Sequence, residues 1–283
     1  NGTSLDDWVG ATVEVDNMLW AHIEALQKMR RFVVGYTGSH GIPNALDVLV
    51  DAAKLLSEES VSFVLVGDGH LKSHLQARVR SERISNVHFF DPVPKKQMPA
   101  LLKGFDAVFL GAPKSPIYRF GVSPNKMIDY MMAGVPIVYA IEAGNDPVQD
   151  AGCGISVPAD HPTCLAEAIR GLMKMDQSSR VAMGARGVPY AKSNYVPCTC
   201  RKILDGHNRN RDMSKTIMVL APHTDDGEFG CGGTIAKYVA EGARVVYAAF
   251  SAAEQSVLPH LPRDILRTEV RLATAALGVR DED

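Results

Sequence analysis

The chain has 283 residues, of which 46% are apolar and 22% charged, and its formal net charge is −2. The length and composition are typical of a soluble globular protein of one large or two ordinary domains. The net charge is too small to indicate electrostatic attraction to a nucleic acid or a membrane surface. No stretch approaches the roughly 20 apolar residues of a membrane span. We therefore expect a cytoplasmic protein without a nucleic-acid partner, whose five cysteines are reduced.

Short β-branched runs alternate with longer segments whose apolar residues recur at helical spacing. The expected strands are 31–38, 61–69, 86–93, 107–113 and 136–141, and the expected helices are 44–59, 70–83, 98–105, 123–134 and 164–175. The strands are continuous apolar runs, as in parallel sheets covered on both faces. The sequence thus predicts an α/β domain over residues 1–205 with a Rossmann-like parallel sheet.

A second βα series follows a polar stretch, 206–212, which we interpret as a linker. The expected elements of this series are strands 216–223 and 244–251 and helices 231–242 and 263–278. Two strands and two helices enclose too little core for a whole domain, so we expect 213–283 to be a partial Rossmann-like α/β unit with Met213 as its natural start. Because residue 1 is not methionine, we also expect the chain to start inside a longer protein.

Polar and glycine-rich segments follow the expected strands of the first unit. In doubly wound sheets, ligands bind beyond the C-terminal ends of the strands. Those ends are 38–41, 67–69, 91–93 and 120–126. Glycines permit close backbone approach and helix starts offer N–H groups, a combination that favours phosphate binding. Gly67 and Gly69 are equally consistent with ordinary turns.

Five blocks occur in an order that resembles the family-four glycosyltransferases, which have the GT-B fold with two Rossmann-like domains. The blocks are GYTGSHG, FVLVGDG, NVHFFDPVP, SPNKMIDYMMAGVPIV and GCGISVPADHP. The match covers about residues 1–205 and only the second, donor-binding domain. It implies transfer from a nucleotide-diphospho-sugar, of UDP-N-acetylhexosamine type, to an envelope polysaccharide or lipid-linked glycan acceptor. The acceptor-binding N-terminal domain would be missing, and the resemblance allows peripheral membrane association of the full-length enzyme.

The resemblance assigns roles near the first and third strand ends. Gly38, Ser39 and Gly41 would border the diphosphate, and Val93 would border the base. Two features depart from many relatives: an Arg/Lys pair near the first glycine loop is absent, and Gly121 stands in place of a glutamate. The diphosphate would therefore depend more on backbone dipoles, and we expect this chain alone to bind the donor weakly.

The resemblance also assigns roles around the start of the helix 123–134. Ser123, Pro124 and Asn125 would offer backbone N–H groups to the phosphates, and Lys126 would act catalytically by adding positive charge to the leaving diphosphate. Asp129 would bind the ribose hydroxyls. Simpler alternatives are a solvated lysine at a helix start for Lys126, and a first-turn acid favoured by the helix dipole for Asp129.

The segment APHTDDGEFGCGGTI, 221–235, places one histidine and three acids directly after an expected strand. The spacing of His223 and Asp226 lets an imidazole nitrogen and a carboxylate oxygen meet one Zn²⁺. Asp225 is then free to take a proton from a metal-bound water, and Glu228 would support the site from behind. The alternative is an Asx turn or N-cap formed by the two aspartates.

This segment, with LRTEVRLATAALGV downstream, resembles the PIG-L/LmbE-type zinc deacetylases of N-acetylated sugars. The resemblance implies zinc ligation by the histidine and the second aspartate and a general-base role for the first aspartate. Thr224 replaces the usual proline and Gly227 is an extra residue, which leaves the role of Glu228 open. The family's third ligand is a later histidine, and we do not assign His260 to it. The chain is thus predicted to be the donor half of a glycosyltransferase; the alternatives are an incomplete zinc-dependent deacetylase or a nucleotide-sugar-binding module without catalysis.

Overall fold

The computed structural model describes residues 17–195, 215–252, 254, 257 and 261–280, apart from the side chains of Asn17 and Phe229. The chain divides into two compact units at residues 200 and 201. The predicted linker 206–212, the start at Met213 and His260 lie outside the described residues. No helix in the described segments is both long enough and apolar enough to cross a membrane.

The first unit is built on a six-stranded parallel sheet with the strand order β3-β2-β1-β4-β5-β6. Its strands are β1 (Phe32–Thr37), β2 (Val61–Val66), β3 (Val87–Phe90), β4 (Ala107–Gly111), β5 (Ile137–Ala140) and β6 (Gly154–Ser156). The strand order reverses between β1 and β4, which makes the crevice beyond their C-terminal ends the expected ligand site. The predicted α/β, Rossmann-like class is confirmed.

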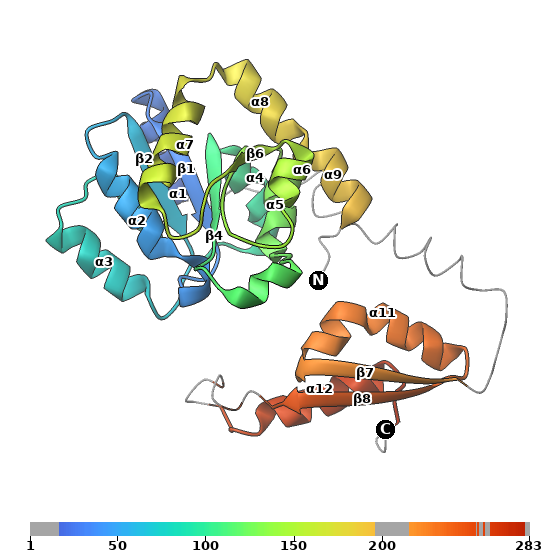
Figure 1. Cartoon of the computed structure of the whole chain (residues 1–283). Coiled ribbons are helices and arrows are strands. Elements are labelled where there is room, and N and C mark those ends of the chain that lie inside the picture. Colours follow the sequence, from blue (N-terminus) through green and yellow to red (C-terminus); the bar gives the residue numbers. More distant parts are fainter. Residues whose placement is uncertain (1–16, 196–214, 253, 255–256, 258–260, 281–283) are drawn as a thin grey trace. The chain divides into compact units, whose positions relative to one another are not determined.

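Helices cover both faces of this sheet (Figure 1). They are α1 (Asn17–Lys28), α2 (Leu46–Leu55), α3 (Lys72–Ser81), α4 (Met98–Lys103), α5 (Asn125–Ala133), α6 (Pro147–Ala151), α7 (Pro162–Lys174), α8 (Gln177–Ala185) and α9 (Gly187–Asn194). Short 3₁₀ turns are η2 (Ile42–Asn44), η3 (Lys95–Gln97) and η4 (Pro116–Phe120). The sequence pattern did not predict α1, α6, α8 or α9.

Alternate residues of the strands enter two separate cores, because successive side chains of a strand point to opposite faces. Val33 and Val108 pack with residues of α1, α4 and α5, whereas Val34 and Phe109 pack with residues of α2, α3 and α7. Burial on both faces explains why the strand sequences are apolar without alternation. The first of these cores packs α5 against the sheet, and α5 begins at the expected ligand site.

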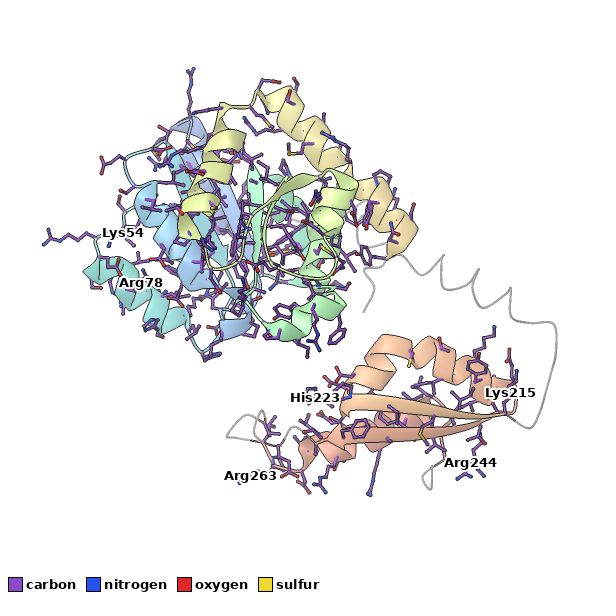
Figure 2. All side chains as sticks on the ribbon, in the orientation of Figure 1. Lys54, Arg78, Lys215, His223, Arg244 and Arg263 are labelled. Carbon is purple, nitrogen blue, oxygen red and sulfur yellow. The ribbon has the colours of Figure 1, made fainter. Side chains whose placement is uncertain are left out.

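An ionic cluster joins α2 to the end of α3 on the second of these faces. Arg78 bonds Asp51, lies 3.3 Å from Asp47 and donates to Glu82 over 2.8 Å. Lys54 reaches the other oxygen of Glu82, also over 2.8 Å (Figure 2 labels Lys54 and Arg78). These bonds from Lys54 and Arg78 lower the pKa of Glu82 to about 2. Networks of this kind stabilise more than isolated surface pairs.

The second unit contains a two-stranded parallel sheet and two long helices. Its elements are β7 (Thr216–His223), α11 (Asp226–Ala240), β8 (Arg244–Ser251) and α12 (Ile265–Ala276). The predicted order strand, helix, strand, helix is thus found. However, α11 begins at Asp226 instead of residue 231, and its backbone is non-helical at Cys231 (φ −144°, ψ 22°). The cysteines within the described segments, Cys153, Cys164 and Cys231, are free thiols.

Candidate functional site

The loops that follow β1 and β2 are stacked main chain on main chain. A Cβ at Gly67 would lie 1.9 Å from the carbonyl oxygen of Gly38, and a Cβ at Gly69 would lie 2.6 Å from that of His40. Both glycines also have positive φ angles, of 151° and 154°. Backbone bonds from Gly38 to Val66 (2.9 Å) and from His40 to Asp68 (2.7 Å) hold the stack. Gly67 and Gly69 are therefore required by close approach as well as by turn geometry.

Helix α5 is fixed to the end of β1 by a buried tyrosine. The hydroxyl of Tyr130 accepts the backbone N–H of Thr37 over 2.9 Å and lies 3.3 Å from both the Thr37 hydroxyl and the Thr37 carbonyl oxygen. Tyr130 is wholly buried, and burial raises its pKa to about 12. Lys126 lies one helical turn earlier on the same face. The anchor therefore carries Lys126 to the loop that follows β1.

The Lys126 side chain packs against this loop and is partly buried. A Cβ at Gly38 would lie 3.0 Å from Cε of Lys126, so these two predicted site residues are neighbours. The ammonium donates to Asn44 Oδ1 and to the Tyr36 hydroxyl (3.3 Å), and it lies 5.1 Å from the centre of the Tyr36 ring. Lys126 is thus not the solvated lysine of the simpler interpretation. Burial lowers the pKa of its ammonium from 10.5 to about 8.

The other residues predicted near the diphosphate surround the same position. Ser39 is exposed, and its carbonyl accepts the Tyr36 hydroxyl (2.6 Å) and the Asn44 amide (2.8 Å). Gly41 is buried and precedes η2, beside the Ser39 side chain. These bonds fix the course of the loop from residue 38 to residue 44. Tyr36 and Asn44 were not predicted, because their link to Lys126 joins segments about 80–90 residues apart.

The start of α5 offers free backbone amides. Ser123 and Asn125 are exposed there, and Pro124 is the residue before the first helical position. No described side chain caps this end, and the first amides of a helix have no partner within it. The prediction that Pro124 offers an N–H group is wrong, because proline has none. The amides of Asn125 and Lys126 are the available donors at this end.

The turn before α5 explains one departure from the family pattern. Gly121 has a φ of 97°, and a Cβ there would lie 3.1 Å from Asn145 Oδ1. Asn145 accepts the N–H of Val122 over 2.8 Å and donates to its carbonyl over 3.0 Å. A glutamate at position 121 would be strained by this backbone and crowded by Asn145. Asn145 is thus a positioning residue that the sequence pattern did not indicate.

Val93 and Asp129 are the two remaining residues predicted to contact the donor. Val93 follows the edge strand β3, is partly buried and packs against the core beneath α1, α4 and α5. Asp129 is partly exposed on α5, one turn after Asn125. Their assigned contacts with base and ribose stay predictions.

Two basic groups beneath the stacked loops were not predicted. Lys72 donates to the carbonyls of Gly67 (2.8 Å) and Phe90 (3.2 Å) and to Asp91 (2.7 Å), which fixes the ends of β2 and β3. The His40 ring is fully buried, and neither nitrogen has a hydrogen-bond partner within the described residues. Burial, helped by the positive charge of Lys72, lowers the pKa of His40 to about 4. His40 is therefore neutral at physiological pH.

In the second unit the structure brings two of the predicted metal ligands together. Nδ1 of His223 lies 3.1 Å from Oδ2 of Asp226, and the same oxygen accepts the His223 backbone N–H over 2.9 Å. His223 stands at the end of β7, labelled in Figure 2, and both side chains are about half exposed. An imidazole and a carboxylate are donors that suit Zn²⁺. Within the described segments no third His, Cys, Asp or Glu side chain completes such a group.

The other two acids of this motif have different surroundings. Asp225 is exposed and is the N-cap residue of α11, but its carboxylate makes no capping bond there. Glu228 accepts the hydroxyl of Tyr247 on β8 over 2.5 Å. Burial and this bond raise the pKa of Tyr247 to about 12, so the hydroxyl keeps its proton at neutral pH. The N-cap interpretation of Asp225 is thus not supported, and the carboxylate is available for other chemistry.

Comparison with known proteins assigns the first unit to a family. The family model for glycosyl transferases group 1 matches residues 31–175, more than half of the chain. The chain belongs to the group 1 glycosyl transferases. The model for the GlcNAc-PI de-N-acetylases (PIG-L) matches residues 218–283.

Several group 1 relatives show the extent of this likeness. The chain is 25% identical over 150 residues to the probable glycosyltransferase WbjE of Pseudomonas aeruginosa, covering 52% of this chain and 37% of that protein. It is 25% identical over 154 residues to the putative colanic acid biosynthesis glycosyl transferase WcaI of Escherichia coli K12, covering 53% and 37%. The fold is similar to Anabaena Alr3699/HepE, crystallised with UDP and glucose (TM-score 0.56, 18% identity, 73% and 55% covered). The chain thus spans about a third of the length of these curated relatives.

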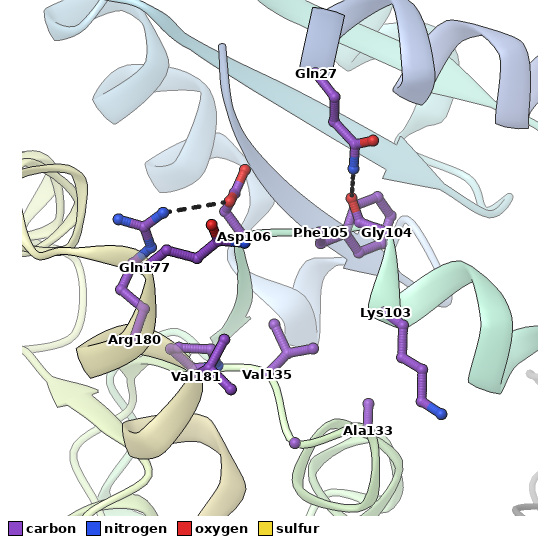
Figure 3. A pocket seen from close by; sticks show the side chains of 12 residues that line it. Gln27, Lys103, Gly104, Phe105, Asp106, Ala133, Val135, Gln177, Arg180 and Val181 are labelled. Carbon is purple, nitrogen blue, oxygen red and sulfur yellow. Dashed lines mark hydrogen bonds and ion pairs between the residues drawn. The ribbon is translucent and has the colours of Figure 1, made fainter. Parts of the chain in front are cut away.

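A pocket of the group 1 domain lies at the opposite, N-terminal edge of the sheet (Figure 3). Asp106 accepts the Val33 N–H over 2.9 Å and lies 3.7 Å from Arg180 of α8, and burial raises the pKa of its carboxyl. Gln27 of α1 donates to the Gly104 carbonyl over 3.0 Å. These polar groups attach α1 and α8 to the sheet. We therefore interpret these hydrogen bonds and this ion pair as structural contacts between elements.

Proposed function

We propose that the first unit binds the nucleotide-diphospho-sugar donor of a glycosyl transfer reaction, with a UDP-N-acetylhexosamine-type donor and an envelope glycan as acceptor. The observation that carries this proposal is the contact of Lys126 with Gly38 at the point where the strand order reverses. Membership of the group 1 family supports the reaction class. The UDP-bound HepE structure, which shares the fold, is consistent with the nucleotide.

In this proposal the diphosphate lies between the loop after β1 and the start of α5. The amides of Asn125 and Lys126 donate to its oxygens, because the helix leaves them unpaired and its dipole favours an anion. The Lys126 ammonium leaves Asn44 and binds the phosphate that departs with the nucleoside, where negative charge grows as the sugar bond breaks. The acceptor is held by a second domain, so this unit alone binds the donor without efficient transfer.

Calorimetric titration of the full chain with UDP, GDP and UDP-N-acetylglucosamine tests the donor site. Lys126→Met removes a charged donor to phosphate and is expected to weaken UDP binding by about 10- to 100-fold. Lys103→Met, which changes an exposed lysine of α4 at the opposite edge of the sheet, is the matched control and is expected to bind UDP like wild type. Equal affinities for wild type and Lys126→Met would show that the site is elsewhere. Donor binding without transfer, after an acceptor domain is joined to the chain, would favour a pure binding module.

A second candidate function belongs to residues 213–283. The adjacent His223 and Asp226 side chains, together with the PIG-L match, favour a zinc-dependent deacetylase of N-acetylated sugars. These two residues would hold the zinc, which would polarise an amide carbonyl and lower the pKa of a bound water. Asp225, uncommitted to the helix cap, would take the proton of that water. The described residues supply two protein ligands, so this site is incomplete by itself.

Zinc content tests whether the second unit binds a metal ion. Metal analysis after dialysis against micromolar zinc is expected to show less zinc in His223→Ala than in wild type. His207→Ala, in the predicted linker region of the sequence, is the control for histidine number. Equal zinc in wild type and His223→Ala would refute the ligand assignment.

A further inference from the structure

The hydroxyl of Tyr247 lies at the centre of the turn that carries the acids of the second unit. It accepts the backbone N–H of Gly227 over 3.0 Å and lies 3.1 Å from the carbonyl oxygen of Thr224 and 2.5 Å from Oε2 of Glu228. Tyr247 belongs to β8, where it pairs with Val219 of β7. A side chain from the neighbouring strand therefore contacts three residues of one turn.

The bond to Gly227 replaces a helix cap. Gly227 is the second residue of α11, so its N–H has no acceptor within the helix. The residue at the N-cap position, Asp225, does not supply one from its own side chain. The Tyr247 hydroxyl supplies it instead. The short helical piece that precedes the kink at Cys231 therefore has an acceptor for its Gly227 amide, and the Asp225 carboxylate stays available.

Gly227 and Tyr247 are matched in shape. A Cβ at Gly227 would lie 2.4 Å from Cε2 and 2.5 Å from the hydroxyl oxygen of the Tyr247 ring. Any other residue at position 227 would push the ring away from the turn. This contact gives the extra glycine of the motif a physical reason. It also places Glu228 against β8, where its carboxylate is the nearer of the two acceptors within reach of the hydroxyl.

We propose that Tyr247 is a positioning residue: it holds the turn 224–228 so that His223 and Asp226 face one divalent metal ion, and Glu228 is its acceptor and not a metal ligand. The metal part of this inference rests on the deacetylase proposal. The Asp226 carboxylate already lies against the His223 ring and amide, so both ends of the turn are fixed, one by Asp226 and the other by Tyr247.

Amide hydrogen exchange of the metal-free full chain, resolved by residue, tests the positioning role. In Tyr247→Phe the Gly227 amide is expected to exchange at least about tenfold faster, because the variant loses only the hydroxyl. The amides of Val219 and Val245 in the sheet are expected to keep their protection. Tyr238→Phe removes a hydroxyl from α11 in the same small core and is the matched control, with no expected change at Gly227.

Competition with a fluorescent zinc chelator provides a second readout. Tyr247→Phe is expected to weaken zinc binding by about 10-fold or more, as is usual when the support of a ligand is removed. Glu228→Gln keeps the ring, the glycine and an acceptor for the hydroxyl, and is expected to cost less than Tyr247→Phe. It also tests the contact if Tyr247→Phe does not fold.

Three outcomes would overturn the inference in different ways. Unchanged Gly227 exchange in Tyr247→Phe would show that the hydroxyl does not hold the turn. A loss of zinc in Glu228→Gln as large as in His223→Ala would make Glu228 a ligand. Equal zinc binding by wild type and His223→Ala would refute the metal role together with the deacetylase proposal, and the exchange result would then decide the positioning role alone.

Discussion

Replacing Lys126 by methionine is expected to stabilise the first unit while weakening its affinity for a nucleotide diphosphate. Burial lowers the ammonium pKa from 10.5 to about 8, which corresponds to about 3 kcal/mol of unfavourable free energy for the charged form in the folded state. Methionine fills similar space without a charge. The bonds to Asn44 and Tyr36 are lost, at about 1 kcal/mol for each. The expected net gain at pH 7 is therefore about 1–2 kcal/mol.

The size of this effect depends on pH. The unfolded state binds more protons than the folded state between about pH 8 and pH 10.5, so the unfolding free energy of wild type should rise across this window. Below pH 8 the full penalty is present. The advantage of Lys126→Met should thus be largest at pH 7 and shrink towards pH 10.5.

Urea denaturation at several pH values measures this difference in stability. Tryptophan fluorescence is a suitable signal, because both tryptophans precede residue 21 and therefore belong to the first unit. Lys103→Met is the control and should show no such pH dependence. A Lys126→Met variant that is less stable than wild type at pH 7, and that binds UDP equally well, would refute the reasoning on both counts.

Other predictions follow from the same contacts. UDP affinity should fall as pH rises above about 8, because free Lys126 loses its proton there and must regain it to bind phosphate; calorimetry with flat affinity from pH 7 to 9.5 would contradict this. Tyr130→Phe leaves the buried Thr37 amide without its acceptor and should cost about 1–3 kcal/mol, measurable by urea denaturation, with weaker UDP binding. Gly121→Glu, which restores the family's acid, should destabilise the unit by about 1–2 kcal/mol because of the positive φ and Asn145, and should not improve UDP binding; a gain in affinity would argue against the turn described here.

Local sequence patterns predicted the elements whose signals are short in range. Continuous apolar runs gave β1, β2 and β4, and Gly134, left-handed at φ 69°, ends α5 where the pattern ended. The 3₁₀ turn η2 was not predicted: the helix expected from Asn44 begins at Leu46, because Asn44 belongs to that turn. The position of the Lys126 side chain against the loop after β1 depends on contacts with Tyr36 and Asn44, which are 90 and 82 residues away in the sequence.

In the second unit, too, the local sequence pattern missed a contact between segments that are distant in the sequence. The residues DGEFG have two glycines and little helix propensity, so the pattern predicts a helix only from Cys231. In the structure a short helical piece from Asp226 precedes a kink at Cys231, and a tyrosine 20 residues later in the chain satisfies the Gly227 amide of this piece. The identities of the metal-motif residues were visible in the sequence, but the partner of Glu228 was not.

The stacked loops after β1 and β2 also bear on how such a protein can diversify. Peptide groups, not side chains, form the wall where Gly67 meets Gly38 and Gly69 meets His40. The side chains of exposed Ser39 and partly buried Val93 can change without altering that wall, since the wall consists of main chain. In the proposed donor site, side chains around this wall can therefore change the preference for nucleoside or hexose while the pyrophosphate meets the same backbone.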